Sequence, residues 1–207
     1  MIKNFIEKSW LLIIAAFGFG VLLAGTNEWL APKIKQQQIK KFNNLAGSMI
    51  EGAENFENVS EEPVIVKSAS GKPLEVRSLK KGVNADGDVI GWAFVAEGSG
   101  FADRIQLVIG VDAEFEKIKG YGVLLSNETP GFGDKIGNPD HYFAKQFAGT
   151  PTERLELSKI GDWEKIEGDT EIIAISGATV TSEAVVSIFN TYVEQVKKYL
   201  ADKGFLK

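Results

Sequence analysis

The feature that most constrains this chain is an uncharged, mostly apolar run near its start, SWLLIIAAFGFGVLLAGTN, between Lys8 and Glu28. As a helix rising about 1.5 Å per residue, this run would be roughly 28 Å long, close to the hydrocarbon thickness of a bilayer. Trp10 and Trp29 stand at its two ends, where interfacial aromatic residues occur in membrane helices. We therefore predict one uncleaved transmembrane anchor over residues 1–30, inserted in the lipid bilayer.

The main alternative for this run is a cleaved signal peptide, because Leu23, Ala24 and Gly25 form a passable cleavage context. A buried core helix fits less well, since the run is apolar on all faces and lies at the N-terminus. A lipoprotein leader is excluded, because Thr26 stands where the lipidated cysteine would have to be.

The lysines around the run give a mild indication of its orientation. Lys3 and Lys8 precede it, whereas more lysines follow, between residues 33 and 41. Counted alone, they would leave the C-terminal part in the cytoplasm, although long domains are translocated with little regard for such charges.

Residues 31–50 follow as a predicted amphipathic stalk helix that starts after Pro32. Residues 52–62 are mostly polar and predict a loop. Beyond them, apolar runs alternate with Gly, Asp and Asn turns, as in consecutive β-strands. The expected strands are 64–68, 73–79, 88–97, 104–112, 117–128 and 171–175, with a short helix in 139–149 and a long helix from 181 to 200.

Strands that follow one another with few helices between them favour an α+β fold with antiparallel sheets. The last helix has apolar residues along one face, as expected of a helix packed on a sheet. We therefore predict one α+β domain over residues 51–207, closed by a C-terminal helix, behind a single transmembrane helix.

The composition excludes several kinds of function. There is no cysteine, so disulfides, cysteine-ligated iron–sulfur clusters and thiolate zinc sites are excluded. His141 is the only histidine, which makes a redox-metal site a poor hypothesis, and we predict no metal ligands. The net charge is −5 and no basic block is present, so we expect no nucleic-acid partner. Redox chemistry in this chain would need an organic cofactor.

One unusual stretch is ISGATVTSEAV, in which small residues separate an apolar strand from a helix. Thr181 or Ser182 is a natural N-cap, which would put Thr179 about one turn ahead of the helix. A helix N-terminus favours a phosphate group, and Gly177 and Ala178 would leave room for one near the main chain. The simpler interpretation is an ordinary cluster of capping residues.

A second unusual stretch is NETPGFGDKI, residues 127–136. Gly131 and Gly133 permit positive φ, and together with proline they predict a compact loop at the end of a strand. Phe132 would be exposed in this loop unless something packs on it. Taken alone, the stretch is more simply interpreted as a decorated surface loop, and no general acid–base pair or nucleophilic triad accompanies it.

Together, and behind an anchor helix, ETPGFGDK and SGAT resemble the FMN-binding G subunit of the Rnf electron-transport complex. The chain resembles more distantly the C subunit of the sodium-pumping NADH:quinone reductase. The likeness runs from the anchor through GSGFADRIQLVIGVD and ETPGFGDKI to SGATVTS and the last helix. A length near 200 residues favours the Rnf protein over its longer relative.

The resemblance implies that FMN is attached through its phosphate to Thr179 by a separate flavin transferase. Ser176, Gly177 and Ala178 would then admit the phosphoester, and the helix end would help to neutralise its charge. From the residues alone, Thr179 and Thr181 are equal candidates. The family's motif usually carries an acidic residue three positions before the serine, and this chain has Ile173 there.

The resemblance also implies a second group of flavin-contacting residues. It consists of Glu128, Thr129, Pro130, Gly131, Phe132 and Gly133, with Gly100 from a glycine–aromatic pair completed by Phe101. We expect Thr129 and the loop backbone to hydrogen-bond the flavin ring edge, and Phe132 to shield a ring face. His141 is either a proton donor to reduced flavin or, more simply, a residue at the start of a helix.

The function implied is that of an electron-carrying component of a membrane-bound, ion-translocating ferredoxin:NAD oxidoreductase, which is not catalytically self-sufficient. Its partners would be the A, B, C, D and E subunits of the Rnf complex, above all the D subunit, which also carries covalent flavin. A covalent tether and the family precedent favour a soluble domain on the extracytoplasmic side of the bacterial inner membrane. The alternatives are a stand-alone anchored flavoprotein serving extracytoplasmic acceptors, a role like that of the C subunit of the quinone reductase, or a flavin-free interaction domain.

Overall fold

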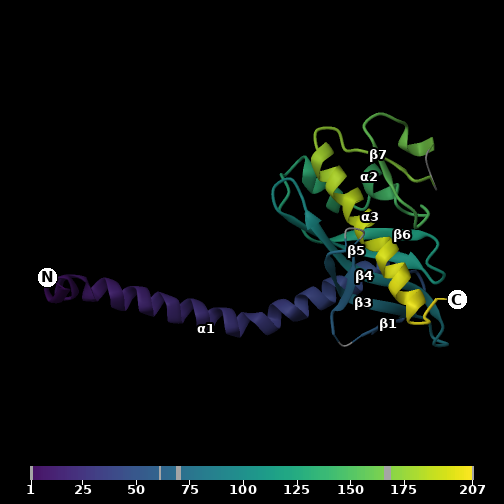
Figure 1. The fold of residues 1–207 in the computed structure, drawn as a ribbon. Helices are drawn as coiled ribbons and strands as arrows, with labels where there is room; N and C mark the ends of the chain where they lie inside the picture. The colour runs from purple at the N-terminus through teal and green to yellow at the C-terminus, as the bar shows by residue number, and fades with distance from the viewer. Residues whose placement is uncertain (1, 61, 69–70, 166–168, 207) are drawn as a thin grey trace. The chain divides into compact units, whose positions relative to one another are not determined.

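The computed structural model of this chain describes residues 2–60, 62–68, 71–165 and 169–206. The chain forms two compact units, Met1–Lys41 and Phe42–Lys207. The elements, coloured along the chain in Figure 1, are α1 (Ile2–Met49), β1 (Asn55–Asn58), β2 (Val64–Lys67), β3 (Pro73–Val83), β4 (Val89–Ser99), β5 (Arg104–Asp112), β6 (Ile118–Leu125), η1 (Gly133–Gly137), α2 (Tyr142–Lys145), β7 (Glu156–Ser158), η2 (Trp163–Lys165), β8 (Glu171–Ile173) and α3 (Thr179–Asp202).

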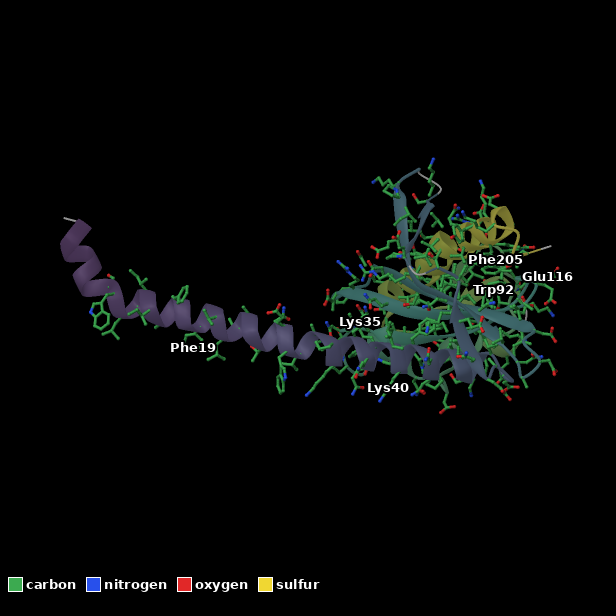
Figure 2. All side chains as sticks on the ribbon, turned by 90° about the horizontal axis from the view of Figure 1, so that it is seen from below. Phe19, Lys35, Lys40, Trp92, Glu116 and Phe205 are labelled. Atoms are coloured by element: carbon green, nitrogen blue, oxygen red, sulfur yellow. The ribbon has the colours of Figure 1, made fainter. Side chains whose placement is uncertain are left out.

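Helix α1 is continuous where the sequence predicted two helices. Pro32 lies inside the helix and not at the start of a second one. It cannot donate the backbone hydrogen bond that an ordinary residue there would make to the Glu28 carbonyl, and the helix continues without it. From Ser9 the helix is long and apolar enough to cross a membrane, and side chains such as Phe19 project into open space (Figure 2).

The folded unit is built on a six-stranded sheet in the order β1-β3-β4-β5-β6, with β2 also paired to β3. All of these pairings are antiparallel, which confirms the predicted α+β class. The small sheet of β7 and β8 is parallel. β1 falls within the predicted polar loop, because pairing with β3 at the sheet edge, and not an apolar pattern, makes it a strand.

The two faces of the sheet are covered by different helices. Along β4 the side chains alternate: Trp92 and Phe94 pack in the cluster that contains α3, whereas Ala93 and Val95 pack in the cluster that contains the end of α1. The end of α1 supplies the buried residues Phe42 and Ala46, and Ile50, directly after the helix, joins them. The sheet is therefore enclosed on both faces, as a stable core requires.

Glycines on the sheet allow the end of α1 to approach it closely. A Cβ atom at Gly122 of β6 would lie 2.6 Å from Leu45, and one at Gly91 of β4 would lie 2.9 Å from Ile50. On the other face, Trp92 donates its indole N–H to the Ala113 carbonyl at 3.0 Å and meets the ring of Phe205, with 5.9 Å between ring centroids (Figure 2). The end of α1 therefore packs closely on one face of the sheet, and the segment after α3 packs on the other through Phe205.

Candidate functional site

A cleft of about 450 Å³ lies where three segments that are distant in the sequence meet. They are the turn between β4 and β5, the loop after β6, and the beginning of α3. The lining residues are Phe101, Thr129, Phe132, Gly133, Gly177, Ala178, Thr179, Val180 and Thr181. All of these side chains are uncharged, and the volume is within the range of small-molecule sites.

The β4–β5 turn contributes an exposed aromatic ring to the cleft. The Gly100 N–H donates to the Asp103 carbonyl at 2.8 Å, which closes the turn. Phe101 at its tip is 67% exposed, and its ring forms part of the cleft lining. Gly100 itself lies behind the lining, where a Cβ atom would collide with Glu128 and with the Asp103 carbonyl.

The loop after β6 contributes the second ring. The Phe132 N–H donates to the Thr129 carbonyl at 3.2 Å, and Gly131 between them has φ +79°, as predicted for this turn. Phe132 is 53% exposed and faces the cleft. Gly133 does not have a positive φ; it is needed because a Cβ atom there would lie 2.8 Å from both Glu128 Oε2 and Thr181 Oγ1.

The start of α3 corrects one expectation from the sequence. Thr179 is the first residue of the helix, not a residue one turn ahead of it, and Ala178 occupies the N-cap. Ser182 does not cap the helix, since its hydroxyl accepts from the Ile175 N–H and donates to the Ala178 carbonyl, both at 3.0 Å. The backbone N–H groups of the first turn, which lack partners within the helix, therefore begin at Thr179.

The hydroxyl groups around this turn differ in their availability. Thr181 is 2% exposed and donates to Glu128 Oε2 at 2.5 Å, and Ser182 is fully buried with both bonds made. Ser176 is exposed and lies outside the cleft lining. Thr179 is half-buried in the lining, and within the described part of the chain its hydroxyl has no hydrogen-bond partner. Among the hydroxyls of this turn, Thr179 is thus the one that lines the cleft without a hydrogen-bond partner in the described residues; Thr129, from the loop after β6, lines the same cleft.

Glu128 joins the three segments from behind the cleft. It belongs to the loop after β6, its Oε1 accepts from the Ala102 N–H at 3.0 Å, and its Oε2 accepts from Thr181. It is only 5% exposed and does not line the cleft. We call Glu128, Ala102 and Thr181 the buried Glu128 cluster. The sequence placed Glu128 among the flavin-contacting residues, whereas here it supports the residues that line the cleft.

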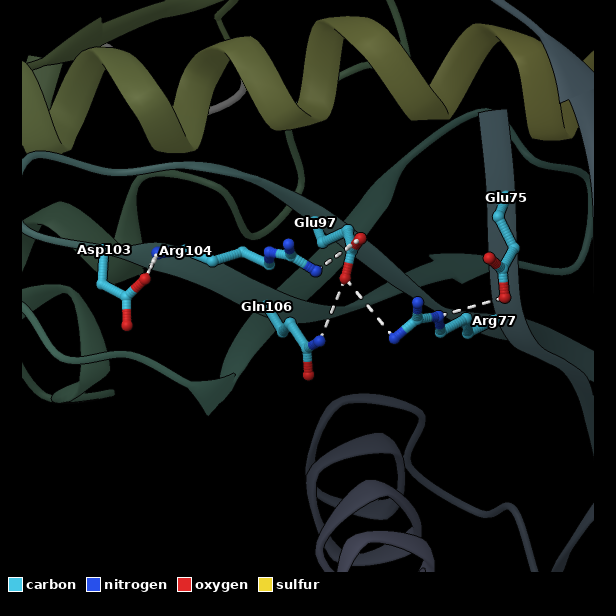
Figure 3. A network of polar contacts seen from close by, with 6 residues as sticks. All are labelled: Glu75, Arg77, Glu97, Asp103, Arg104 and Gln106. Carbon is cyan, nitrogen blue, oxygen red and sulfur yellow. Dashed lines mark hydrogen bonds and ion pairs between the residues drawn. The ribbon is translucent and has the colours of Figure 1, made fainter. Parts of the chain in front are cut away.

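A second polar group lies on the sheet beside the same turn (Figure 3). Glu97 contacts Arg104 at 3.4 Å, Arg77 at 3.7 Å and Gln106 at 3.0 Å, and Arg77 contacts Glu75 at 3.1 Å. We call these five residues the exposed ion network. Next to it, hydrogen bonds from Asn127 and from the Arg104 N–H hold the pKa of the Asp103 carboxyl below its ordinary value.

Helix α2 fixes the segment that leads into the SGAT turn. The buried side chain of Gln146 accepts from the Ile173 N–H at 2.7 Å and donates to the Ile173 carbonyl at 3.1 Å. Tyr142 donates its hydroxyl to the Ala174 carbonyl at 2.8 Å. Ile173 itself is buried, so the position that is usually acidic in the resembling family holds a core side chain in this chain.

The structure brings together most of the residues that the motifs indicated. Thr129, Phe132, Gly133, Gly177, Ala178 and Thr179 line the cleft, whereas Gly100, Glu128, Gly131 and Ser176 do not. Val180 lines it without having been predicted, and so does Thr181, which the residues alone had left as an alternative to Thr179. His141 is outside the lining: its Nδ1 accepts from the Phe143 N–H at 3.3 Å at the start of α2, which agrees with the simpler of its two interpretations.

The sequence and the fold were compared with known proteins. Residues 100–194, which include the whole cleft, match the model of the FMN-binding domain family. The chain is 30% identical to the G subunit of the ion-translocating oxidoreductase complex of Methanosarcina acetivorans, over 90% of each chain. It is 31% identical to the G subunit of the Na(+)-translocating ferredoxin:NAD(+) oxidoreductase complex of Acetobacterium woodii, over 83% of this chain and 82% of that one.

Among solved structures, the fold is similar to NqrC of Shewanella oneidensis. The TM-score is 0.53 at 20% identity, over 76% of this chain and 74% of the other. At this level of identity the likeness concerns the fold, and it agrees with an antiparallel sheet covered by a C-terminal helix.

Proposed function

This chain belongs to the family of G subunits of ion-translocating oxidoreductase complexes, the Rnf family, and we propose that it carries electrons through an FMN covalently bound to Thr179. FMN supplies the redox chemistry, since its ring accepts and releases electrons. The protein binds the cofactor, orients the ring and limits its access to water.

The observation that carries this proposal is the free hydroxyl of Thr179 in the cleft. Its competitors in the same turn are engaged or lie outside the lining: Thr181 donates to Glu128, and Ser182 is buried between Ile175 and Ala178. A phosphoester at Thr179 would stand at the first turn of α3, where free N–H groups and the helix dipole favour negative charge. Geometry thus supports the acceptor that sequence reasoning alone could not choose.

The rest of the lining suits an aromatic ring system. Phe101 and Phe132 expose two apolar rings at the cleft, and contact with a flavin ring would remove both from water. Thr129 and the loop backbone offer polar groups for the ring edge. Gly177 has φ +80°, and a Cβ atom there would lie 3.3 Å from the ring of Phe132, so glycine lets the SGAT turn and this ring approach each other. We therefore assign these residues to cofactor binding.

The decisive experiment is mass spectrometry of the peptide containing Thr179, on protein from the source membrane or from a host that supplies the flavin transferase. We expect an FMN-sized addition on Thr179 in the native chain, and its loss in Thr179→Val. Thr181→Val and Ser176→Ala are matched controls that should keep the addition. An unmodified native peptide, or an addition on Thr181, would contradict the assignment.

We further propose that residues 1–30 anchor the chain, residues 31–50 form the stalk, and residues 51–207 bind the flavin on the extracytoplasmic side. Support comes from the long apolar part of α1 and from the covalent tether, which keeps a flavin where a dissociable one would be lost. Protease added to spheroplasts should cut residues 31–207. Protection of this region while an extracytoplasmic control protein is digested would refute the orientation.

The proposed partners are the A, B, C, D and E subunits of the complex, with the D subunit as the neighbouring covalent flavoprotein, and the transferase during maturation. Mild solubilisation and affinity purification of the full chain should recover these proteins together. Recovery of the flavinylated chain alone, under conditions that keep the other components associated with one another, would favour a stand-alone flavoprotein.

A further inference from the structure

Glu128 is a buried carboxylate that has no cationic partner among the residues described by the structure. Both of its oxygens accept hydrogen bonds, one from the Ala102 N–H and one from the Thr181 hydroxyl, which is the pattern of an ionised carboxylate. Across the described residues, no Lys, Arg or His nitrogen lies within 4.0 Å of these oxygens. Thr181 belongs to the first turn of α3, and the positive end of the helix dipole favours a negative charge there.

This carboxylate lies directly behind the wall of the cleft. Thr181, which bonds to it, lines the cleft, and so does Gly133, where a Cβ atom would lie 2.8 Å from Glu128 Oε2. A single layer of protein atoms therefore separates the carboxylate from the space that the proposed cofactor would fill. With the carboxylate only 5% exposed, water screens its field weakly in that direction.

We propose that Glu128 acts as a fixed negative charge behind the flavin site and lowers the reduction potential of the flavin bound there. This inference rests on the proposed function. Reduction by two electrons and one proton adds one negative charge to the flavin, whereas two electrons and two protons add none. A fixed negative charge opposes the first of these outcomes by Coulomb repulsion, and so makes the flavin a stronger reductant.

The test is a redox titration of the full-length chain, purified from membranes of cells that supply the flavin transferase. Covalent flavin is first quantified by mass spectrometry and by the fluorescence of the denatured protein. The midpoint potential is then measured spectroelectrochemically, with an electrode as the electron source. In Glu128→Gln, which keeps the shape and removes the charge, we expect the ratio of reduced to oxidised flavin at a fixed potential to rise about tenfold. For a two-electron couple this is a positive shift of about 30 mV.

Two matched variants separate charge from structure. Asp134→Asn removes the same charge from an exposed position in η1, directly after the loop, where solvent and salt screen it, so its shift should be much smaller. Thr181→Val removes the hydroxyl donor and leaves the charge with one donor fewer. Thr181→Val should therefore shift the midpoint potential negatively or leave it unchanged. If Glu128→Gln acted only by loosening the cleft, Thr181→Val would loosen the cleft too and would give the same positive shift.

If Glu128→Gln does not accumulate, Glu128→Met combined with Thr181→Val replaces both partners by apolar side chains and is compared with Thr181→Val alone. The inference is overturned if removing the Glu128 charge shifts the potential no more than Asp134→Asn does. It is also overturned if Thr181→Val gives the same positive shift. A native chain with no flavin on Thr179 would instead overturn the proposed function, and this inference with it.

Discussion

The buried Glu128 cluster and the exposed ion network lie beside the same β4–β5 turn, yet they differ in what they contribute to the fold. In the exposed ion network the side chains of Glu75, Arg77 and Arg104 are roughly half exposed, and Glu97 meets two arginines at 3.4 Å or more. In the buried Glu128 cluster a single carboxylate accepts from one hydroxyl and one backbone N–H, with water almost excluded.

This difference indicates where the cleft depends on single residues. Exposed ion pairs are each worth about 0–1 kcal/mol, because solvent and salt compensate for their loss. A buried polar group cannot be compensated in this way, so losing its partner costs about 1–3 kcal/mol, and more for charged groups. We therefore expect the cleft to tolerate changes in the larger network and to be sensitive to changes in the smaller one.

The largest effect is expected for Glu128→Ala. It leaves the Thr181 hydroxyl and the Ala102 N–H without acceptors and creates a small cavity, so the free energy of unfolding should fall by about 2–4 kcal/mol. Denaturant unfolding of the detergent-solubilised chain, followed by tryptophan fluorescence, measures this. Glu97→Ala in the exposed ion network is the matched control, and an equal loss in both variants would remove the contrast between the two clusters.

Two glutamines allow the same comparison of a buried and a more exposed polar side chain without a change of charge. Gln146→Leu deprives both the N–H and the carbonyl of Ile173 of their partners in a buried place, and we expect a loss of about 2 kcal/mol. Gln106→Leu removes a hydrogen bond to the partly exposed Glu97 and should cost well under half as much. The same unfolding measurement checks both. If Gln146→Leu and Gln106→Leu lowered the free energy of unfolding by similar amounts, burial would not determine the cost of losing these hydrogen bonds.

The contrast between these regions also explains which parts of the fold the sequence could predict. Strands β2 to β6 and helix α3 follow from local apolar periodicity, which each element carries by itself. The first residue of α3 was misplaced, because Thr181 and Ser182 have the side chains of N-caps but bond instead to Glu128 and Ile175. Glu128 lies 53 positions from Thr181, so no local pattern reveals that bond, whereas Ser182 bonds within its own turn region, to Ile175 seven positions before it. The edge strand β1 was missed because it too depends on a distant partner, β3.

Those residues of the site could be predicted that belong to a short motif forming part of the cleft wall. ETPGFGDK and SGAT indicated Thr129, Phe132 and Thr179, and all three line the cleft. The supporting role of Glu128 could not be predicted, since it depends on a hydrogen bond to a residue 53 positions away. Within the motif, Glu128 resembled a ligand-contacting residue as much as its neighbours did. Only the packing of the three segments shows that Thr129 and Phe132 line the cleft whereas Glu128 lies behind the lining.

The exposed ion network should respond to salt rather than to the loss of single partners. Glu97→Gln is expected to lower the free energy of unfolding by less than about 1 kcal/mol at low ionic strength, and by less still in molar salt. A double-mutant cycle between Glu97 and Arg104 isolates the pair at 3.4 Å. A coupling energy that stays the same from low to high salt would mean that this pair is shielded from solvent like the buried Glu128 cluster.

The smallest effect on the free energy of unfolding is expected from His141. Its imidazole is partly buried, and so is intermediate between the two clusters in its exposure to water. Burial, and then the charge of Lys135, hold the pKa of this imidazole below its ordinary value of 6.5. The unfolded chain therefore binds a proton more readily than the folded one, so the free energy of unfolding decreases as the pH falls below about 6.5.

Protonation of His141 also removes the Nδ1 lone pair that accepts from the Phe143 N–H. His141→Asn keeps an N-cap acceptor without titrating, so stability should fall less between pH 7 and pH 5 in this variant than in the native chain, by a small amount because solvent screens the partly exposed imidazole. Identical pH profiles for the two proteins would show that the imidazole behaves as a fully solvated group, with no share in the sensitivity of buried polar contacts.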